Sequence, residues 1–223
     1  MLIIFDLDDT LIDTTGSITP VKLELALARM IEAGLKIGDF QESLDTLKRI
    51  DSASESASQT LLEFLEILDA DNKYFEIGKS AVYHDLSQDI PVYALDQAHE
   101  VLSELGSEHL LALVSMGIQE QQLLKLKKAG IDSTIFSKII ISEERDKKPH
   151  YKTILDEFGF TPGQTLVCGD RVQRDLTPAK ELGCITVHMQ WGRGLNPAFA
   201  KSQDVDFAIK NLSQIKEILS SVV

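Results

Sequence analysis

The sequence predicts an α/β protein whose core is a doubly wound, mainly parallel sheet, with a small all-helical domain inserted after the first strand. Two observations predict this class. From about residue 96 onward, short apolar runs typical of buried strands alternate with stretches of helical periodicity. Between residues 14 and 84, by contrast, no convincing strand pattern occurs and apolar residues recur with helical spacing.

Five apolar runs are the expected strands of the core. The first, residues 2–5, is too short for a helix and is followed at once by acidic residues. The others are residues 110–114, 138–141, 165–168 and 184–188. Helices are expected at about 96–105, 119–129, 149–158 and 212–219, with a further helix that contains Asp175 and ends at Gly183. Strands that alternate with helices imply right-handed crossovers and parallel pairing.

The inserted domain is expected to contain helices at about 20–34, 40–50, 61–68 and 73–83. Pro20 suits a first helical turn, and Gly34 suits a helix end. We therefore expect residues 1–14 and 88–223 to form the Rossmann-like core and residues 15–87 to form the helical domain. Within the latter, the polar segment 51–58, flanked by Lys48 and Arg49, is the part expected to face a substrate crevice.

The charge of the chain argues against two classes of partner. The 223 residues carry a net charge of −13, and the sequence pI is about 4.8. Nucleic acids and anionic membranes are bound by clustered Lys and Arg, so neither is expected as a partner. No apolar run approaches the ~20 residues of a membrane helix, and no signal peptide is recognisable. Cys168 and Cys184 lie in or beside expected strands as small buried hydrophobes, so a reduced, cytoplasmic location is expected.

Polar residues follow four of the expected strands. They are Asp6 and Asp8, Ser115, Lys148 a few residues past its strand, and Asp170 with Asp175. Because the carboxyl ends of parallel strands face one crevice, these side chains should converge. Crowded carboxylates are unfavourable unless a cation neutralises them, and their hard oxygens suit Mg²⁺.

This ordered set resembles the four short motifs of the haloacid dehalogenase-like hydrolase superfamily. The motifs are Asp6-Leu7-Asp8-Asp9-Thr10, Ser115, Lys148 before Pro149, and Gly169-Asp170-Arg171-Val172-Gln173-Arg174-Asp175. The resemblance covers roughly residues 1–14 and 92–190, and the helical insertion looks like the small α-helical cap of that family. Each motif alone is weak, but all four in order at strand ends are specific.

The resemblance implies a Mg²⁺-dependent phosphatase that cleaves a small phosphomonoester through an aspartyl-phosphate intermediate. Asp6 is then the nucleophile, and Asp8 is the general acid for the leaving alcohol and the general base for water. Mg²⁺ is held by Asp6, the backbone carbonyl of Asp8, and Asp170. Asp175 orients Lys148 or a metal-bound water rather than binding the metal directly.

The resemblance also assigns groups to the phosphate. Lys148 is expected to touch both Asp6 and the phosphoryl group, whereas its neighbour Lys147 is interpreted as a solvated charge. Ser115 and the backbone amides of Met116 and Gly117 are expected to donate to the remaining phosphate oxygens.

Two alternatives stay open. A phosphomutase of the same fold differs only in contacts that the pattern does not reveal. A non-enzymatic phosphoacceptor or binding module also gathers acids, a hydroxyl and a lysine around Mg²⁺. Such a module needs neither an acid two residues beyond the phosphorylated aspartate nor a long helical insertion over the site. The pattern identifies neither the natural substrate nor the pathway nor the oligomeric state.

Overall fold

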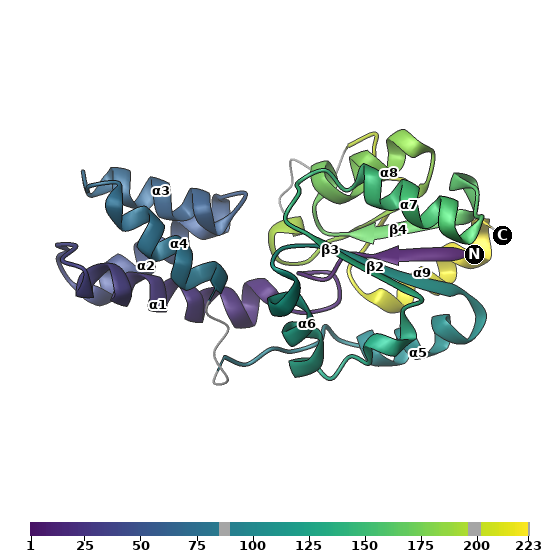
Figure 1. The fold of residues 1–223 in the computed structure, drawn as a ribbon, viewed down its shortest axis with the longest axis horizontal. Helices are drawn as coiled ribbons and strands as arrows, with labels where there is room; N and C mark the ends of the chain where they lie inside the picture. The colour runs from purple at the N-terminus through teal and green to yellow at the C-terminus, as the bar shows by residue number, and fades with distance from the viewer. Residues whose placement is uncertain (85–89, 196–201, 223) are drawn as a thin grey trace. The chain divides into compact units, whose positions relative to one another are not determined.

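The computed structural model describes residues 1–84, 90–195 and 202–222 (Figure 1). The chain separates into two compact units, residues 1–14 with 92–223, and residues 15–91. We call these the sheet unit and the helical unit. The expected junction between residues 87 and 88 lies outside the described residues.

The sheet unit is built on one six-stranded sheet, as far as the chain is described. Its strands are β1 (Leu2–Phe5), β2 (Leu110–Met116), β3 (Lys138–Ser142), β4 (Thr165–Gly169), β5 (Ile185–Met189) and β6 (Phe207–Ile209). All neighbours pair in parallel in the order β3-β2-β1-β4-β5-β6. The predicted doubly wound α/β class is therefore confirmed, with β1 at the centre of the sheet.

The edge strand β6 was not expected. It has three residues, Phe207, Ala208 and Ile209, and it pairs with Val187–Met189 of β5. Three residues are too few to show a period, so only the neighbouring strand reveals that this segment is extended.

Helices cover both faces of the sheet (Figure 1). They are α5 (Ala98–Glu108), α6 (Gln119–Lys128), α7 (Lys148–Phe158), α8 (Thr177–Leu182) and α9 (Ile215–Val222). Helices α7 and α8 lie on one face, and α5 and α6 lie on the other. On the first face, Tyr151 and Ile154 of α7 are buried against Ile4 and Val114 of the central strands. This packing fixes the strand ends from which the polar groups project.

The helical unit contains α1 (Thr19–Glu32), α2 (Phe40–Ala53), α3 (Ala57–Ile67) and α4 (Lys73–His84). Their apolar faces enclose a core of their own, which includes Leu27, Leu47 and Phe64. A Cβ on Gly78 would lie 3.0 Å from the Met30 sulfur, so glycine lets α4 approach α1 closely. The unit therefore buries its own apolar surface, as expected for a separate helical domain.

The segment 51–58 differs from the simple polar linker that the sequence suggests. Helix α2 continues to Ala53, and Asp51 is buried and accepts a hydrogen bond from the Thr60 hydroxyl at 2.9 Å. Asp51 therefore ties α2 to α3 inside the helical unit. Ser54 is also buried. Within the described ranges, no helix has the length and apolar character needed to cross a membrane.

Candidate functional site

The candidate site lies at the carboxyl ends of β1, β2 and β4, three adjacent strands at the centre of the sheet. Asp6 follows β1 directly, and its backbone N–H donates to the carbonyl of Cys168 at 2.9 Å. The chain then curls around the Leu7 carbonyl, which accepts from the backbone N–H groups of Leu11 and Ile12. Leu7 and Leu11 are fully buried. The apolar side chains of this motif therefore anchor the turn that presents its acids.

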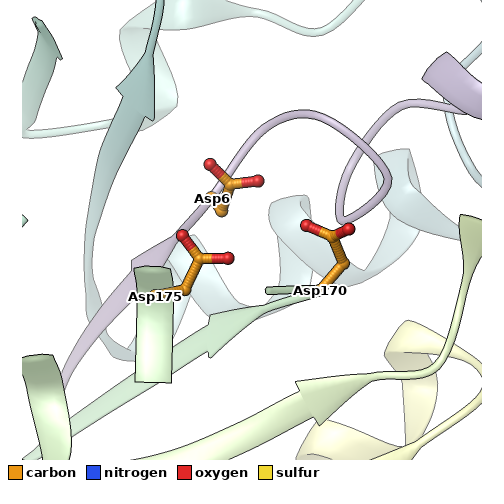
Figure 2. Close-up of side chains that lie close together, drawn as sticks. All are labelled: Asp6, Asp170 and Asp175. Atoms are coloured by element: carbon orange, nitrogen blue, oxygen red, sulfur yellow. The ribbon is translucent and has the colours of Figure 1, made fainter. Parts of the chain in front are cut away.

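Three carboxylates converge at this edge, as Figure 2 shows. One oxygen from each of Asp6, Asp170 and Asp175 lies within 4.8 Å of the other two, and all three residues are buried. Asp170 follows β4, and Asp175 lies in the π-helical turn Val172–Leu176. A Cβ on Gly169 would lie 2.5 Å from the Asp175 Cβ, so only glycine allows this turn to fold back over the strand end.

Lys147 is the cation of this cluster. Its Nζ lies 2.6 Å from Asp6 Oδ1, 2.6 Å from Asp175 Oδ1 and 2.9 Å from the Val114 carbonyl oxygen. An ammonium has three donors, so all three are used. Lys147 is 3% exposed, and its interpretation as a solvated charge was wrong.

Lys148, which the sequence analysis placed beside Asp6, lies elsewhere. Its backbone N–H donates to Asp146 at the start of α7, and its exposed side chain pairs with Glu181 at 2.8 Å. Lys148 belongs to the first turn of the helix, whereas Lys147 precedes it, and a difference of one residue turns the side chain away from the site. The position expected for Lys148 is therefore corrected to Lys147.

Burial dominates the electrostatics of Asp6 and Asp170. Burial raises the pKa of Asp6 to about 7; Lys147 opposes this rise, and the charges of Asp175 and Asp8 add to it. Burial, with Asp175 and Asp9 nearby, raises the pKa of Asp170 well above its usual range, against the opposing charge of Arg171. A second cation would therefore be stabilising here.

The donor set fits Mg²⁺. It consists of carboxylate oxygens, the ligands that this hard cation prefers. Asp175 already accepts from Lys147 through Oδ1 and from the Arg171 backbone N–H through Oδ2. These contacts favour Asp6 and Asp170 as metal ligands and give Asp175 an orienting part, toward Lys147 rather than Lys148.

Asp8 lies in a different environment from Asp6. Its Oδ1 accepts from the Thr14 hydroxyl at 2.5 Å and from Lys125 at 2.7 Å, and its Oδ2 accepts from the Gln122 amide at 2.7 Å. Burial alone would raise the pKa of Asp8, but the Lys125 charge and these hydrogen bonds outweigh it and hold the pKa below its usual range. Both oxygens of Asp8 are thus occupied.

The expected phosphate donors are placed unequally. Ser115 is buried at the end of β2, and its Oγ accepts from the Gln122 amide at 2.7 Å. The N–H of Gly117, however, donates to the Ser142 carbonyl at 2.9 Å, so it is already used. Gly117 instead contributes through its backbone conformation, with φ of 145°. It also leaves room for Gln122, because a Cβ there would lie 3.3 Å from that side chain. The part expected of the Met116 amide stays a prediction.

A loop after β5 closes the site from the side of Asp170. A Cβ on Gly194 would lie 2.5 Å from the Met189 carbonyl oxygen and 3.0 Å from that of Asp170. His188, which is fully buried on β5, lies 3.1 Å from the same Asp170 carbonyl through Nε2. Nearby, Trp191 Nε1 donates to Asp13 at 2.9 Å. The His188 contact holds the Asp170 carbonyl from outside the carboxylate cluster, and glycine at position 194 leaves room beside it.

The sequence analysis missed Lys147, Gln122 and Lys125. One signal could have found Gln122: it stands four residues before the buried Leu126 on α6, so a polar amide occupies the apolar face of the helix. A buried amide needs polar partners. Lys125, three residues after Gln122, then falls near the same partners.

Comparison with known proteins places the fold and the motifs in one family. Residues 3–189 match the family described as haloacid dehalogenase-like hydrolase. The glyceraldehyde 3-phosphate phosphatase of Methanocaldococcus jannaschii is 31% identical over 230 residues, which cover 99% of this chain and 97% of that protein. The protein of the same name from Pyrococcus furiosus is 28% identical, over 98% of this chain and 92% of its own.

Solved structures agree with this placement. One solved structure is a haloacid dehalogenase-like (HAD) hydrolase of Bacillus subtilis bound to magnesium. It has a TM-score of 0.68 at 17% identity, over 98% of this chain and 97% of its own. A HAD phosphatase of Thermococcus onnurineus has a TM-score of 0.64 at 20% identity, over 98% and 97%. At these identities the structural likeness concerns the fold alone. Together with the sequence match over residues 3–189, it confirms the resemblance: this chain belongs to the haloacid dehalogenase-like hydrolase family.

Proposed function

We propose that this protein is a Mg²⁺-dependent phosphatase that hydrolyses a small phosphomonoester through an aspartyl-phosphate formed on Asp6. The observation that carries the proposal is the buried cluster of Asp6, Asp170 and Asp175 at the carboxyl edge of the central strands, in which Lys147 pairs with Asp6 and Asp175. Such a cluster combines a nucleophile, a cation and oxygen ligands for a metal in one place.

The coarser part of the proposal, a phosphomonoester hydrolase of this family, has direct support. The curated relatives that match nearly the whole chain are named glyceraldehyde 3-phosphate phosphatase. We take a three-carbon phosphate of this kind as the first substrate to test. It is a small phosphorylated metabolite, in agreement with the partner class that the motifs imply.

In this proposal, Asp6 attacks phosphorus. Lys147 holds Oδ1 of Asp6, so the carboxylate has a fixed orientation. The three N–H donors of Lys147 all contact protein oxygens. Lys147 therefore orients Asp6 and offsets negative charge, rather than donating a hydrogen bond to the phosphate. Mg²⁺, held by Asp6, Asp170 and the Asp8 backbone carbonyl, would supply the further positive charge that a phosphoryl dianion requires.

In this proposal, Asp8 donates a proton to the leaving group and later accepts one from water. Its carboxylate form, favoured by Lys125, Thr14 and Gln122, suits the base step in which water is activated. An arriving phosphate brings negative charge close to Asp8, and a nearby like charge raises a carboxyl pKa. The substrate itself would thus promote the proton uptake that Asp8 needs before it can donate to the leaving alcohol.

Ser115 provides a hydroxyl for a phosphate oxygen. The helical unit, inserted soon after the loop that bears Asp8, is proposed to contribute contacts to the leaving group and to exclude water. The exposed Lys48 and Arg49 of α2 are candidates for such contacts. Asp51, being buried within the helical unit, is not.

Replacement of Asp6 by Asn tests the proposal. The variant keeps the size of the side chain but removes the attacking charge and a metal ligand, so hydrolysis of glyceraldehyde 3-phosphate and of p-nitrophenyl phosphate should fall by orders of magnitude. Release of inorganic phosphate with Mg²⁺ is the measurement. Asp13→Asn is the matched control, because Asp13 lies outside the carboxylate cluster and accepts from Trp191. Turnover near the wild-type rate in Asp6→Asn would exclude the nucleophile proposed here.

A further inference from the structure

Helix α6 carries two polar side chains that contact Asp8 and lie outside the four motifs. Gln122 is 3% exposed. Its Nε2 lies 2.7 Å from Asp8 Oδ2, 2.7 Å from Ser115 Oγ and 3.4 Å from the Met116 carbonyl oxygen. Lys125, one helical turn later, lies 2.7 Å from the other oxygen of Asp8. One helix face therefore contacts both the acid after β1 and the hydroxyl at the end of β2.

The chemistry of the partners fixes which end of the Gln122 amide faces them. A carboxylate only accepts hydrogen bonds, and the Lys125 ammonium and the Thr14 hydroxyl lie 2.7 Å and 2.5 Å from Asp8 Oδ1 as donors. The nitrogen of the amide must therefore face Asp8. Since the same nitrogen lies 2.7 Å from Ser115 Oγ, the amide also donates to the hydroxyl oxygen.

This arrangement decides the direction of the Ser115 proton. A hydroxyl has one donor and two acceptor positions. Because Gln122 occupies an acceptor position and cannot receive the proton through its nitrogen, the hydroxyl proton is directed to another acceptor. In the proposed reaction that acceptor is a phosphate oxygen.

Gly117 makes the contact sterically feasible. With φ of 145° it turns the chain after β2, and a side chain there would meet the Cδ and Cγ atoms of Gln122 at 3.3 Å. The glycine thus leaves room for Gln122 to lie across the turn. Thr14 completes the arrangement from the other side by donating to Asp8 Oδ1.

We propose that Gln122 and Lys125 are positioning residues, a two-residue clamp that aims Asp8 at the leaving-group oxygen and the Ser115 proton at the phosphate. This inference rests on the proposed function and deepens it. Gln122 acts mainly on phosphate binding, through Ser115. Lys125 acts mainly on the rate of leaving-group departure, through Asp8.

Gln122→Met tests the first half, with Gln119→Met on the exposed start of the same helix as control. The probe is inorganic phosphate, titrated by calorimetry with Mg²⁺ present. Loss of a buried charge-assisted donor should weaken phosphate binding roughly ten- to a hundredfold, whereas the control should change it by less than about twofold. Gln122→Asn, a milder change that shortens the amide, should show a smaller loss. Equal phosphate affinity in Gln122→Met and Gln119→Met would overturn this half.

Lys125→Met tests the second half, with the exposed Lys127→Met as a control of equal charge change. The turnover number for an alkyl phosphate should fall roughly tenfold or more, with KM nearly unchanged and a smaller loss for p-nitrophenyl phosphate. Lys125→Arg, which keeps the cation, should restore much of the rate. A loss in Lys125→Met that is the same for both leaving groups, or no larger than in Lys127→Met, would contradict the clamp.

The two measurements separate the clamp from the function on which it rests. Phosphate binding is read without turnover, so it judges Gln122 even in a protein that hydrolyses nothing. A wild-type protein that binds phosphate with Mg²⁺ but releases none from any phosphomonoester would contradict the proposed function. A hydrolytically active wild type whose clamp variants match their controls would contradict the clamp alone.

Discussion

Asp6 and Asp8 stand two residues apart, and their carboxyl groups lie in contrasting environments. The side chain of Asp6 is 9% exposed and shares one cation, Lys147, with Asp175. The side chain of Asp8 is 30% exposed and forms an ion pair with Lys125 at 2.7 Å. Burial raises the pKa of Asp6 to about 7, whereas Lys125 and its neighbours outweigh burial and lower the pKa of Asp8.

The difference indicates how the two acids divide the chemistry. Around Asp6, buried negative charge exceeds the positive charge of Lys147, so this side favours a metal ion. Around Asp8, each oxygen already has a donor, so this side favours a fixed proton carrier. Environments that push the pKa values of two nearby carboxyl groups apart are how one site obtains two distinct roles.

The largest effect that separates the two acids is expected from Asp8→Asn. This variant keeps the nucleophile but loses the proton carrier, so alkyl phosphate hydrolysis should slow by roughly 10²–10⁴-fold. An aryl phosphate leaves without much protonation, so its first step should suffer less. The measurement compares glycerol phosphate with p-nitrophenyl phosphate in single-turnover kinetics. Equal losses for both substrates would assign Asp8 a structural part only.

The next prediction compares the loss of stability when each of two adjacent lysines is replaced. Lys147→Met leaves Asp6 and Asp175 buried without their shared cation, which should lower the free energy of unfolding by roughly 3–5 kcal/mol. Lys148→Met removes only an exposed pair with Glu181, so about 0–1 kcal/mol is expected. Urea denaturation with Mg²⁺ removed by a chelator provides both values. Similar losses of stability in the two variants would contradict the assignment of Lys147, rather than Lys148, to the site.

These two lysines also show what the sequence could and could not predict. The motif Asp146-Lys147-Lys148-Pro149 indicates a lysine at the start of a helix beside the site. Which lysine enters the site depends on where the first helical turn begins. Here Asp146 caps the backbone of Lys148 and sets that start. Adjacent residues of the same type give no signal that distinguishes them, so only the backbone conformation decides.

The strands and the acidic residues were easier to predict from the sequence than the contacts of Gln122 and Lys125, because they are encoded by short local patterns. The apolar run Leu2–Phe5 gives a buried central strand directly, and Asp6 and Asp170 follow their strands without intervening residues. Gln122 and Lys125 are harder, because they meet Asp8 across 114 and 117 residues of sequence. Such contacts depend on how α6 docks on the sheet, and no short pattern records that docking.

A further effect concerns how the free energy of unfolding depends on pH in the absence of Mg²⁺. The pKa of Asp6 rises from 3.8 to about 7 on folding, chiefly through burial. Between these values the folded state binds more protons than the unfolded state, so the free energy of unfolding should decrease as the pH rises from about 4 to 7. With about 1.4 kcal/mol for each pKa unit, Asp6 contributes at most roughly 4 kcal/mol to this decrease.

Asp8 works in the opposite direction. Its lowered folded-state pKa contributes stability that is present above the unfolded value and is lost as the pH falls below it. Asp6→Asn should therefore flatten the decline toward neutral pH, whereas Asp8→Asn should lower stability at about pH 5 and pH 7 alike. Urea unfolding in chelator at these two pH values measures both. Parallel responses of wild type and Asp6→Asn would show that Asp6 is not the group whose charge opposes folding.

Mg²⁺ should also stabilise the folded protein to a degree that depends on pH. A cation bound to Asp6 and Asp170 favours their ionised forms, so it should add more stability at about pH 7 than at about pH 5. Asp170→Asn should abolish most of this gain, since one ligand is lost, while Asp8→Asn should keep it, because the Asp8 backbone carbonyl is unchanged. Thermal unfolding of the wild type and the two variants, with and without Mg²⁺ at both pH values, gives the six differences. A gain that is independent of pH would mean that the metal does not bind the carboxyl groups whose pKa burial has raised.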